Sequence, residues 1–92
     1  MNIVMLSPGY PAEMAYFTRA LAGAGARVIG VGDQPPDALP EAARSSLAHY
    51  EHVDLADEAA VLGALRGLAQ HVSIDQVECL WEPYMLLAAR IR

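Results

Sequence analysis

Four residues at the ends of apolar segments could contact a ligand: Ser7, Gly9, Tyr10 and Glu82. Ser7, Gly9 and Tyr10 belong to a turn that follows the apolar run 2–6, and Glu82 ends the apolar segment 76–82. A carboxylate at the end of a strand can bind a substrate amine or a sugar hydroxyl, and it can equally cap the helix that follows. Both interpretations of Glu82 remain open at this point.

The turn after the first apolar run is a poor phosphate cradle. A dinucleotide fingerprint needs three glycines in the pattern G-x-G-x-x-G, and here Gly9 stands alone between Pro8 and Pro11, which lack backbone N–H donors. Asp33 occupies the place of the ribose-binding acid, about twenty residues further on. Without the other glycines, the sequence favours a turn leading into a helix and a solvated Asp33.

The remaining reactive side chains do not form a recognisable catalytic or metal-binding set. His49 and His52 are predicted to lie on opposite faces of one strand, and His71 lies at a helix end, so no metal site is expected. Cys79 is the single cysteine, cannot form an internal disulfide and is predicted to be an inert core thiol. Ser7 lacks the G-x-S-x-G context of a hydrolase nucleophile. No catalytic residue is assigned.

Composition and charge exclude several classes of function. The net charge is −5, and the six basic residues are scattered arginines with no lysine, so nucleic-acid binding, a Schiff-base lysine and a P-loop lysine are not expected. The apolar content of 54% predicts a compact core. The apolar stretch Ile3–Leu6 is too short for a signal sequence or a membrane helix. We therefore expect no membrane partner and a cytoplasmic location.

Strand and helix patterns alternate along the chain and predict one α/β domain, residues 1–92. Strands are expected at 2–6, 27–32, 49–53 and 76–82, and helices at 12–24, at 40–47, from 54–58 to about 72, and at 83–92. This alternation predicts parallel strands joined by right-handed crossovers, in the order 3-2-1-4. Ligands bind such sheets beyond the carboxyl ends of the strands, here between the loops 7–10 and 82–84, with Asp33 nearby.

The last predicted helix has no strand after it, whereas a doubly wound sheet normally continues. The sequence therefore predicts the N-terminal part of a longer protein. Leu86, Leu87 and Ile91 would then be exposed, and self-association is expected.

Four segments together resemble the N-terminal, pre-ATP-grasp domain of ATP-grasp ligases, which biotin carboxylase and carbamoyl phosphate synthetase also have. They are Asn2–Gly9, Val28–Asp33, Val53–Leu55 and Glu78–Glu82, the last before an alanine-rich helix. The resemblance spans the whole chain with loose motifs. It implies a three-layer Rossmann-like domain without catalytic residues, in which Gly9, Tyr10 and Glu82 lend substrate contacts to later domains.

For the whole protein, the resemblance implies activation of a carboxylate as an acyl phosphate, followed by attack of an amine or a similar nucleophile. ATP and Mg²⁺ would be held by later domains, and no cofactor by this chain. Its partners would be the C-terminal ATP-grasp domains, or a second copy of the chain. The main alternative is a freestanding module that binds a nucleotide or a sugar nucleotide. A receiver domain is disfavoured because clustered acids after the first strand and a lysine are missing.

Overall fold

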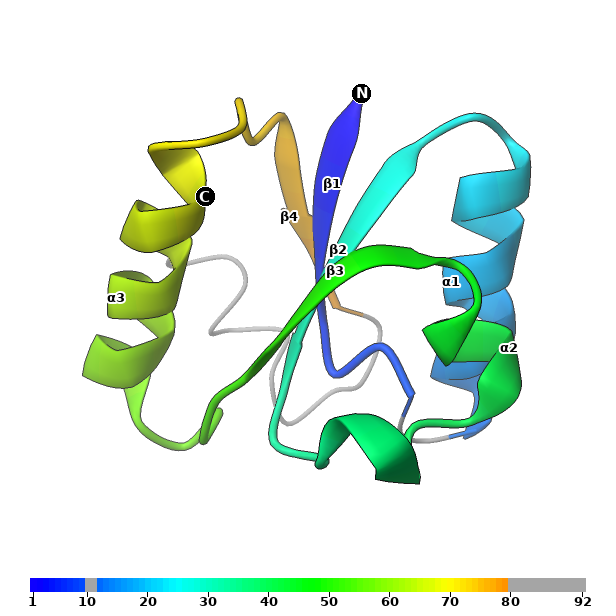
Figure 1. Ribbon diagram of the computed structural model, residues 1–92, viewed down its shortest axis with the longest axis horizontal. Helices are drawn as coiled ribbons and strands as arrows, with labels where there is room; N and C mark the ends of the chain where they lie inside the picture. Colours follow the sequence, from blue (N-terminus) through cyan, green and yellow to red (C-terminus); the bar gives the residue numbers. More distant parts are fainter. Residues whose placement is uncertain (10–11, 80–92) are drawn as a thin grey trace.

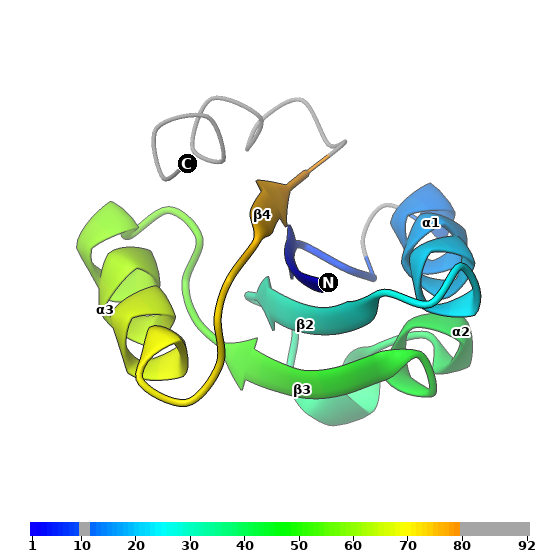
Figure 2. The same cartoon turned by 90° about the horizontal axis from the view of Figure 1, so that it is seen from above.

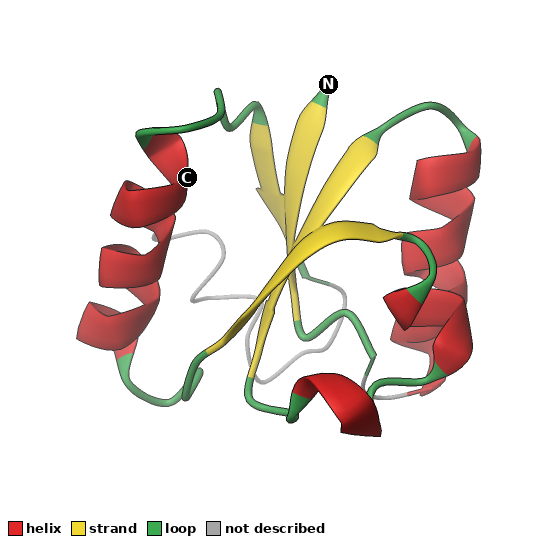
Figure 3. Ribbon diagram, viewed as in Figure 1, coloured by secondary structure: helices red, strands yellow, loops and turns green. Residues whose placement is uncertain are grey.

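The fold is an open sheet with helices on both faces. The computed structural model describes residues 1–9 and 12–79, and Figures 1 and 3 show its elements. In chain order these are β1 (Asn2–Leu6), α1 (Ala12–Gly23), β2 (Arg27–Gly32), a 3₁₀ turn η1 (Pro36–Ala38), α2 (Glu41–Arg44), β3 (Leu47–His52), α3 (Glu58–Ala69) and β4 (Gln76–Glu78).

The four strands are parallel and lie in the order β3-β2-β1-β4, which confirms the predicted topology. β1 is central: it pairs with β2 from Asn2↔Arg27 to Leu6↔Val31, and with β4 from Ile3↔Gln76 to Met5↔Glu78. The β2–β3 register shifts after Val28. The strand order reverses at β1, so the expected switch point between β1 and β4 is present.

Two apolar clusters fill the space between the sheet and its helices. In Figures 1 and 2, α1 and α2 cover one face of the sheet and α3 covers the other. Successive residues of β1 point to opposite faces, so Val4 and Leu6 join the cluster with Val61 and Leu65 of α3, while Met5 joins the cluster with Met14 of α1. This three-layer α/β arrangement is Rossmann-like, as the sequence predicts.

α1 ends in a Schellman motif centred on Gly25. The Ala26 amide donates to the Leu21 carbonyl over 3.1 Å, and the Gly25 amide donates to the Ala22 carbonyl over 3.1 Å. Gly25 has φ of 99°, which side chains with a Cβ rarely adopt. The glycine therefore allows the chain to leave the helix and enter β2.

Replacing Gly25 by alanine should lower the free energy of unfolding by about 1 kcal/mol, because a Cβ is strained at positive φ. The control is Gly23→Ala, since a Cβ at Gly23 meets open space within the helix. That change should raise stability by about 0.5 kcal/mol. Urea unfolding of both variants tests the pair, and two effects of the same sign would contradict the assigned cap.

α3 begins with an aspartate cap, as predicted. The Asp57 side chain accepts a hydrogen bond of 3.1 Å from the Ala60 amide, and the Asp54 side chain accepts one of 2.9 Å from the Ala56 amide. The Asp57 bond satisfies a backbone N–H that the helix start leaves open, whereas the Asp54 bond closes a turn just before the helix. Val61 and Leu65 then face the sheet, with Leu68 and Val72 packed at the edge of the same cluster.

Several predicted bounds were wrong. α1 ends at Gly23 and α3 at Ala69, earlier than the predicted 24 and about 72. The helix expected at 40–47 is only Glu41–Arg44, because the hydroxyls of Ser45 and Ser46 donate to the carbonyls four residues earlier and the helix ends there. β3 begins at Leu47 and ends at His52, earlier than the predicted 49–53. β4 ends at Glu78 within the described residues, and 80–82 and the helix predicted at 83–92 lie outside them.

Within residues 1–9 and 12–79, no helix has both the length and the apolar character needed to cross a membrane.

Candidate functional site

The loop after β1 lies at the carboxyl edge of the sheet. The Ser7 amide donates to the Val31 carbonyl over 2.8 Å, which extends the β1–β2 ladder by one residue. Ser7 itself has φ of 55°, a left-handed conformation that strains a residue with a Cβ. Such strain is concentrated at functional sites, so Ser7 stays a reasonable candidate.

The same loop is buried. Ser7 is 4% exposed, and Pro8 and Gly9 are also buried. The Thr18 hydroxyl, fully buried on α1, lies 3.1 Å from the Pro8 carbonyl and 2.8 Å from the Met14 carbonyl, so its single O–H donates between these two acceptors. α1 therefore holds the loop from one side, and the loop presents little surface to solvent.

The segment 34–40 closes the other side of the loop. A Cβ placed on Gly9 would lie 2.8 Å from Pro40 Cδ, and 2.9 Å from both Gln34 Oε1 and Leu39 Cδ2. Real Cβ atoms essentially never come so close, so the chain needs glycine at position 9 for close packing between two loops. Gly9 thus serves contact within the protein here, and a phosphate would have to displace Leu39 and Pro40.

Tyr50 of β3 locks the closing segment in place. Its hydroxyl donates a 2.7 Å hydrogen bond to the Gln34 carbonyl. Its ring lies against Gly30 and Gly32 of β2, where added Cβ atoms would come within 2.8 Å of the Tyr50 ring carbon Cδ1 and of the Tyr50 hydroxyl, respectively. Burial, followed by the nearby charge of Asp33, raises the pKa of Tyr50 to about 12.

Replacing Tyr50 by phenylalanine should lower the free energy of unfolding at neutral pH by about 1 kcal/mol, since the hydrogen bond to Gln34 is lost. The raised pKa favours the neutral phenol in the folded state. The neutral Tyr50 phenol contributes fully to the free energy of unfolding below pH 10, and this contribution is lost as the pH rises to about 12. The stability difference between wild type and Tyr50→Phe should therefore shrink in this window, as measured by urea unfolding. A difference that stays constant would contradict the assignment.

Two histidines of β3 contact neighbouring residues. His52 Nε2 lies 3.0 Å from the Asp33 carbonyl oxygen, and His49 Nε2 lies 2.8 Å from Glu51 Oε1. Asp33 is exposed, as predicted. No group of three or more metal-ligating side chains occurs within residues 1–9 and 12–79.

The structure brings together only part of the predicted site. Ser7 and Gly9 share the buried loop, whereas Tyr10 and Glu82 lie outside the described residues. Cys79 is buried in the α3 cluster, as predicted.

Sequence reasoning missed Thr18, Tyr50 and the paired glycines of β2, which together determine the loop's shape. Two glycines at i and i+2 of a strand share one face, and this spacing could have signalled the close approach of a bulky side chain.

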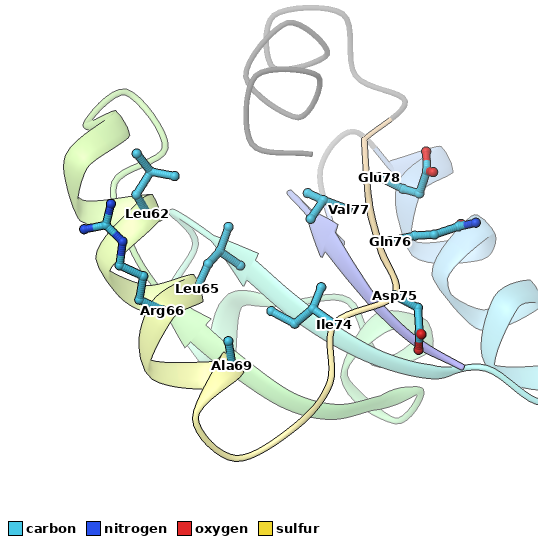
Figure 4. A pocket seen from close by; sticks show the side chains of 9 residues that line it. All are labelled: Leu62, Leu65, Arg66, Ala69, Ile74, Asp75, Gln76, Val77 and Glu78. Carbon is cyan, nitrogen blue, oxygen red and sulfur yellow. The ribbon is translucent and has the colours of Figure 1, made fainter.

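A second candidate is a groove between α3 and β4, shown in Figure 4. Its volume is about 670 Å³, within the usual range of ligand pockets. Leu62, Leu65 and Ile74 supply much of its apolar lining, while Arg66 and Asp75 lie at its margins. Its lining residues come from α3, from β4 and from the two residues just before β4.

Comparison of the chain with protein-family models, curated proteins and solved structures found no match. The class of protein is therefore given by the fold: a parallel, four-stranded α/β domain of the Rossmann-like type.

Proposed function

We propose that this chain is a non-catalytic, substrate-side domain of a larger ATP-dependent ligase of the ATP-grasp type. The observation that favours a supporting role is the closed loop after β1, where Leu39, Pro40 and Gln34 fill the space beside Gly9. A loop that is packed on both sides can determine the shape of a neighbouring surface, but it has no room to cradle a phosphate. The ligase assignment rests on the sequence resemblance together with the strand order.

In this proposal the chain contributes shape and contacts, while the reaction takes place elsewhere. Ser7 and Gly9 hold the loop in its strained, buried form. Tyr10 and Glu82 are the proposed substrate contacts. ATP and Mg²⁺ belong to later domains, and no residue described here is assigned to hold them. The later domains carry out the activation of the carboxylate.

The partners follow from the same proposal. The C-terminal ATP-grasp domains, or a second copy of the chain, would cover apolar surface of this domain. The net charge of −5 disfavours nucleic acid as a partner, because phosphate contacts require clustered basic groups. We place the domain in the cytoplasm, in keeping with its single, buried cysteine.

A freestanding nucleotide- or sugar-nucleotide-binding module is the second candidate. The observations that favour it are the left-handed Ser7 at the carboxyl end of β1 and the exposed Asp33 beyond β2. This candidate requires the segment 34–40 to move away from Gly9 when the ligand binds, because that segment occupies the space beside the loop.

Titration of the ¹⁵N-labelled chain with ATP, NAD and a uridine diphosphate sugar separates the two candidates. The supporting-domain proposal predicts no saturable shifts of the Ser7, Gly9 and Asp33 amides at millimolar ligand. Saturable shifts at these three amides would overturn it in favour of the nucleotide-binding module.

The coding sequence beyond Arg92 gives the second test, which addresses the ligase directly. A continuing frame that encodes a glycine-rich loop with lysines on flanking strands is expected. An immediate stop codon would refute the proposed ligase.

A further inference from the structure

The outer edge of β3 is open in the described part of the chain. β3 pairs with β2 on one side, and residues 1–9 and 12–79 contain no strand that pairs with its other side. In Figures 1 and 2, β3 is the outermost strand of the sheet, at the edge opposite β4. An open edge presents a row of backbone amides and carbonyls that can pair with another strand. The six residues of β3 make this edge about 20 Å long at 3.3 Å per residue.

Alternate residues of β3 direct their backbone groups to the open side. The Val53 amide donates to the Gly32 carbonyl over 2.7 Å, so the backbone of Val53 faces β2. Because the backbone groups of successive residues in a strand point to opposite sides, the amides and carbonyls of Tyr50 and His52 point outward. The Tyr50 ring is turned inward over Gly30 and Gly32 of β2. The outward backbone groups are therefore available to a second strand.

An acidic and a basic side chain alternate on one face of the same edge. His49 and Glu51 are in register with Ile29 and Val31, which belong to the cluster under α3, so both side chains lie on the α3 face of the sheet. The side chains of His49 and Glu51 are 53% and 40% exposed. A strand with a basic group at i and an acidic group at i+2 is complementary to a reversed copy of itself.

One antiparallel register of two β3 strands satisfies both the backbone and the side chains. A twofold axis at Tyr50 places His49 of each copy opposite Glu51 of the other. The outward amide and carbonyl of Tyr50 then exchange two hydrogen bonds with those of the second copy. An axis at Glu51 would oppose two carboxylates, and an axis at His49 would oppose two imidazoles. An axis between two residues would place outward backbone groups opposite inward ones.

We propose that two copies of the chain associate through antiparallel pairing of their β3 edges, with the twofold axis at Tyr50. The inference does not depend on the proposed ligase. Two four-stranded sheets then join into one continuous sheet. The axis is perpendicular to the sheet, so the α3 helices of both copies lie on one face, and α1 and α2 of both copies lie on the other.

The variants His49→Glu and Glu51→Lys of the full chain test this pairing. The wild-type chain is expected to form a dimer that dissociates on dilution, as measured by sedimentation velocity. His49→Glu places acidic groups opposite each other at two cross-strand positions, and Glu51→Lys places basic groups there. Each variant should therefore raise the dissociation constant of the dimer at least tenfold.

An equimolar mixture of the two variants is the matched control. In the mixed dimer, an acidic group again faces a basic group at both cross-strand positions, whereas the pair within each strand stays lost. The heterodimer should therefore form with a dissociation constant within a few-fold of the wild-type value. A role of His49 and Glu51 inside one chain predicts no such rescue.

Amide exchange tests the register directly. The amides of Tyr50 and His52 should exchange at least tenfold more slowly in the wild-type dimer than in the monomeric Glu51→Lys variant. The Val53 amide should exchange within twofold in both, because its bond to Gly32 lies within one chain.

Four outcomes would overturn the proposal. A wild-type chain that stays monomeric at millimolar concentration would exclude the dimer. A dimer that both single variants retain unchanged would place the interface elsewhere on the domain. A mixture without heterodimers, or equal exchange of the Tyr50 and His52 amides in dimer and monomer, would refute the pairing of the β3 edges.

Discussion

Replacing Leu6 by alanine should lower the free energy of unfolding by about 3–5 kcal/mol, the largest effect expected of a single substitution in this domain. Leu6 is completely buried at the end of the central strand, and it packs in the cluster beneath α3. Truncation removes buried apolar surface and leaves a cavity that neighbouring strands cannot readily fill. Domains of this size are stable by only about 5–14 kcal/mol, so the variant should lose a large share of its stability.

Urea unfolding at low temperature is the measurement, with two controls. Leu6→Met conserves the side-chain volume and should lower the free energy of unfolding by less than about 1.5 kcal/mol. Leu21→Ala truncates a leucine that is only half-buried at the edge of the α1 cluster, and its effect should be clearly smaller. If Leu6→Ala and Leu21→Ala had equal effects, the placement of the β1 end in the core would be wrong.

The arrangement of the sheet follows from local patterns in the sequence. The run 2–6 and the run 27–32 are short and apolar, as expected for strands covered on both faces, and both bounds were predicted correctly. The strand order was predictable because right-handed crossovers leave few ways to arrange four alternating strands and helices. The aspartate cap of α3 was predictable because the cap lies within a few residues of the amides that it satisfies.

The closed state of the candidate site was not predictable in the same way. Gly9 meets Leu39 and Pro40, about thirty positions along the chain, and Tyr50 reaches Gln34 from another strand. Contacts between distant segments leave no periodic signal in a single sequence. The sequence predicts that the turn 7–10 lines a ligand crevice at a strand end, whereas Ser7 and Gly9 are enclosed by the segment 34–40 and α1.

The two glycines of β2 offer the second large effect, and they test how Tyr50 closes the site. Gly30→Ala should lower the free energy of unfolding by about 1–3 kcal/mol through overpacking. Its Cβ would meet Tyr50 Cδ1 at 2.8 Å, and Leu47 Cδ1 and Pro8 Cγ at 2.9 Å. Tyr50 and Leu47 belong to β3 and Pro8 to the buried loop after β1, so an added Cβ at Gly30 would press on two segments at once.

The loss of stability caused by Gly32→Ala should depend on the Tyr50 hydroxyl, unlike the loss caused by Gly30→Ala. The closest atom to its Cβ is the Tyr50 hydroxyl oxygen at 2.8 Å, and the next contacts, at 3.4 and 3.5 Å, are close to ordinary van der Waals contact. Removing that oxygen with Tyr50→Phe should therefore abolish most of the decrease in the free energy of unfolding that Gly32→Ala causes. The same background should leave the cost of Gly30→Ala nearly unchanged, because the ring carbon, Leu47 and Pro8 remain.

Double-mutant cycles by urea unfolding measure this difference in coupling. The control is Gly63→Ala on α3, where a Cβ meets open space and a helix favours alanine, so stability should rise by up to about 1 kcal/mol in either background. Equal coupling of Gly30 and Gly32 to the Tyr50 hydroxyl would mean that the ring is not seated over β2 as described. Selective coupling at Gly32 would place the hydroxyl above the end of β2, where its hydrogen bond to Gln34 keeps the segment 34–40 closed over Gly9.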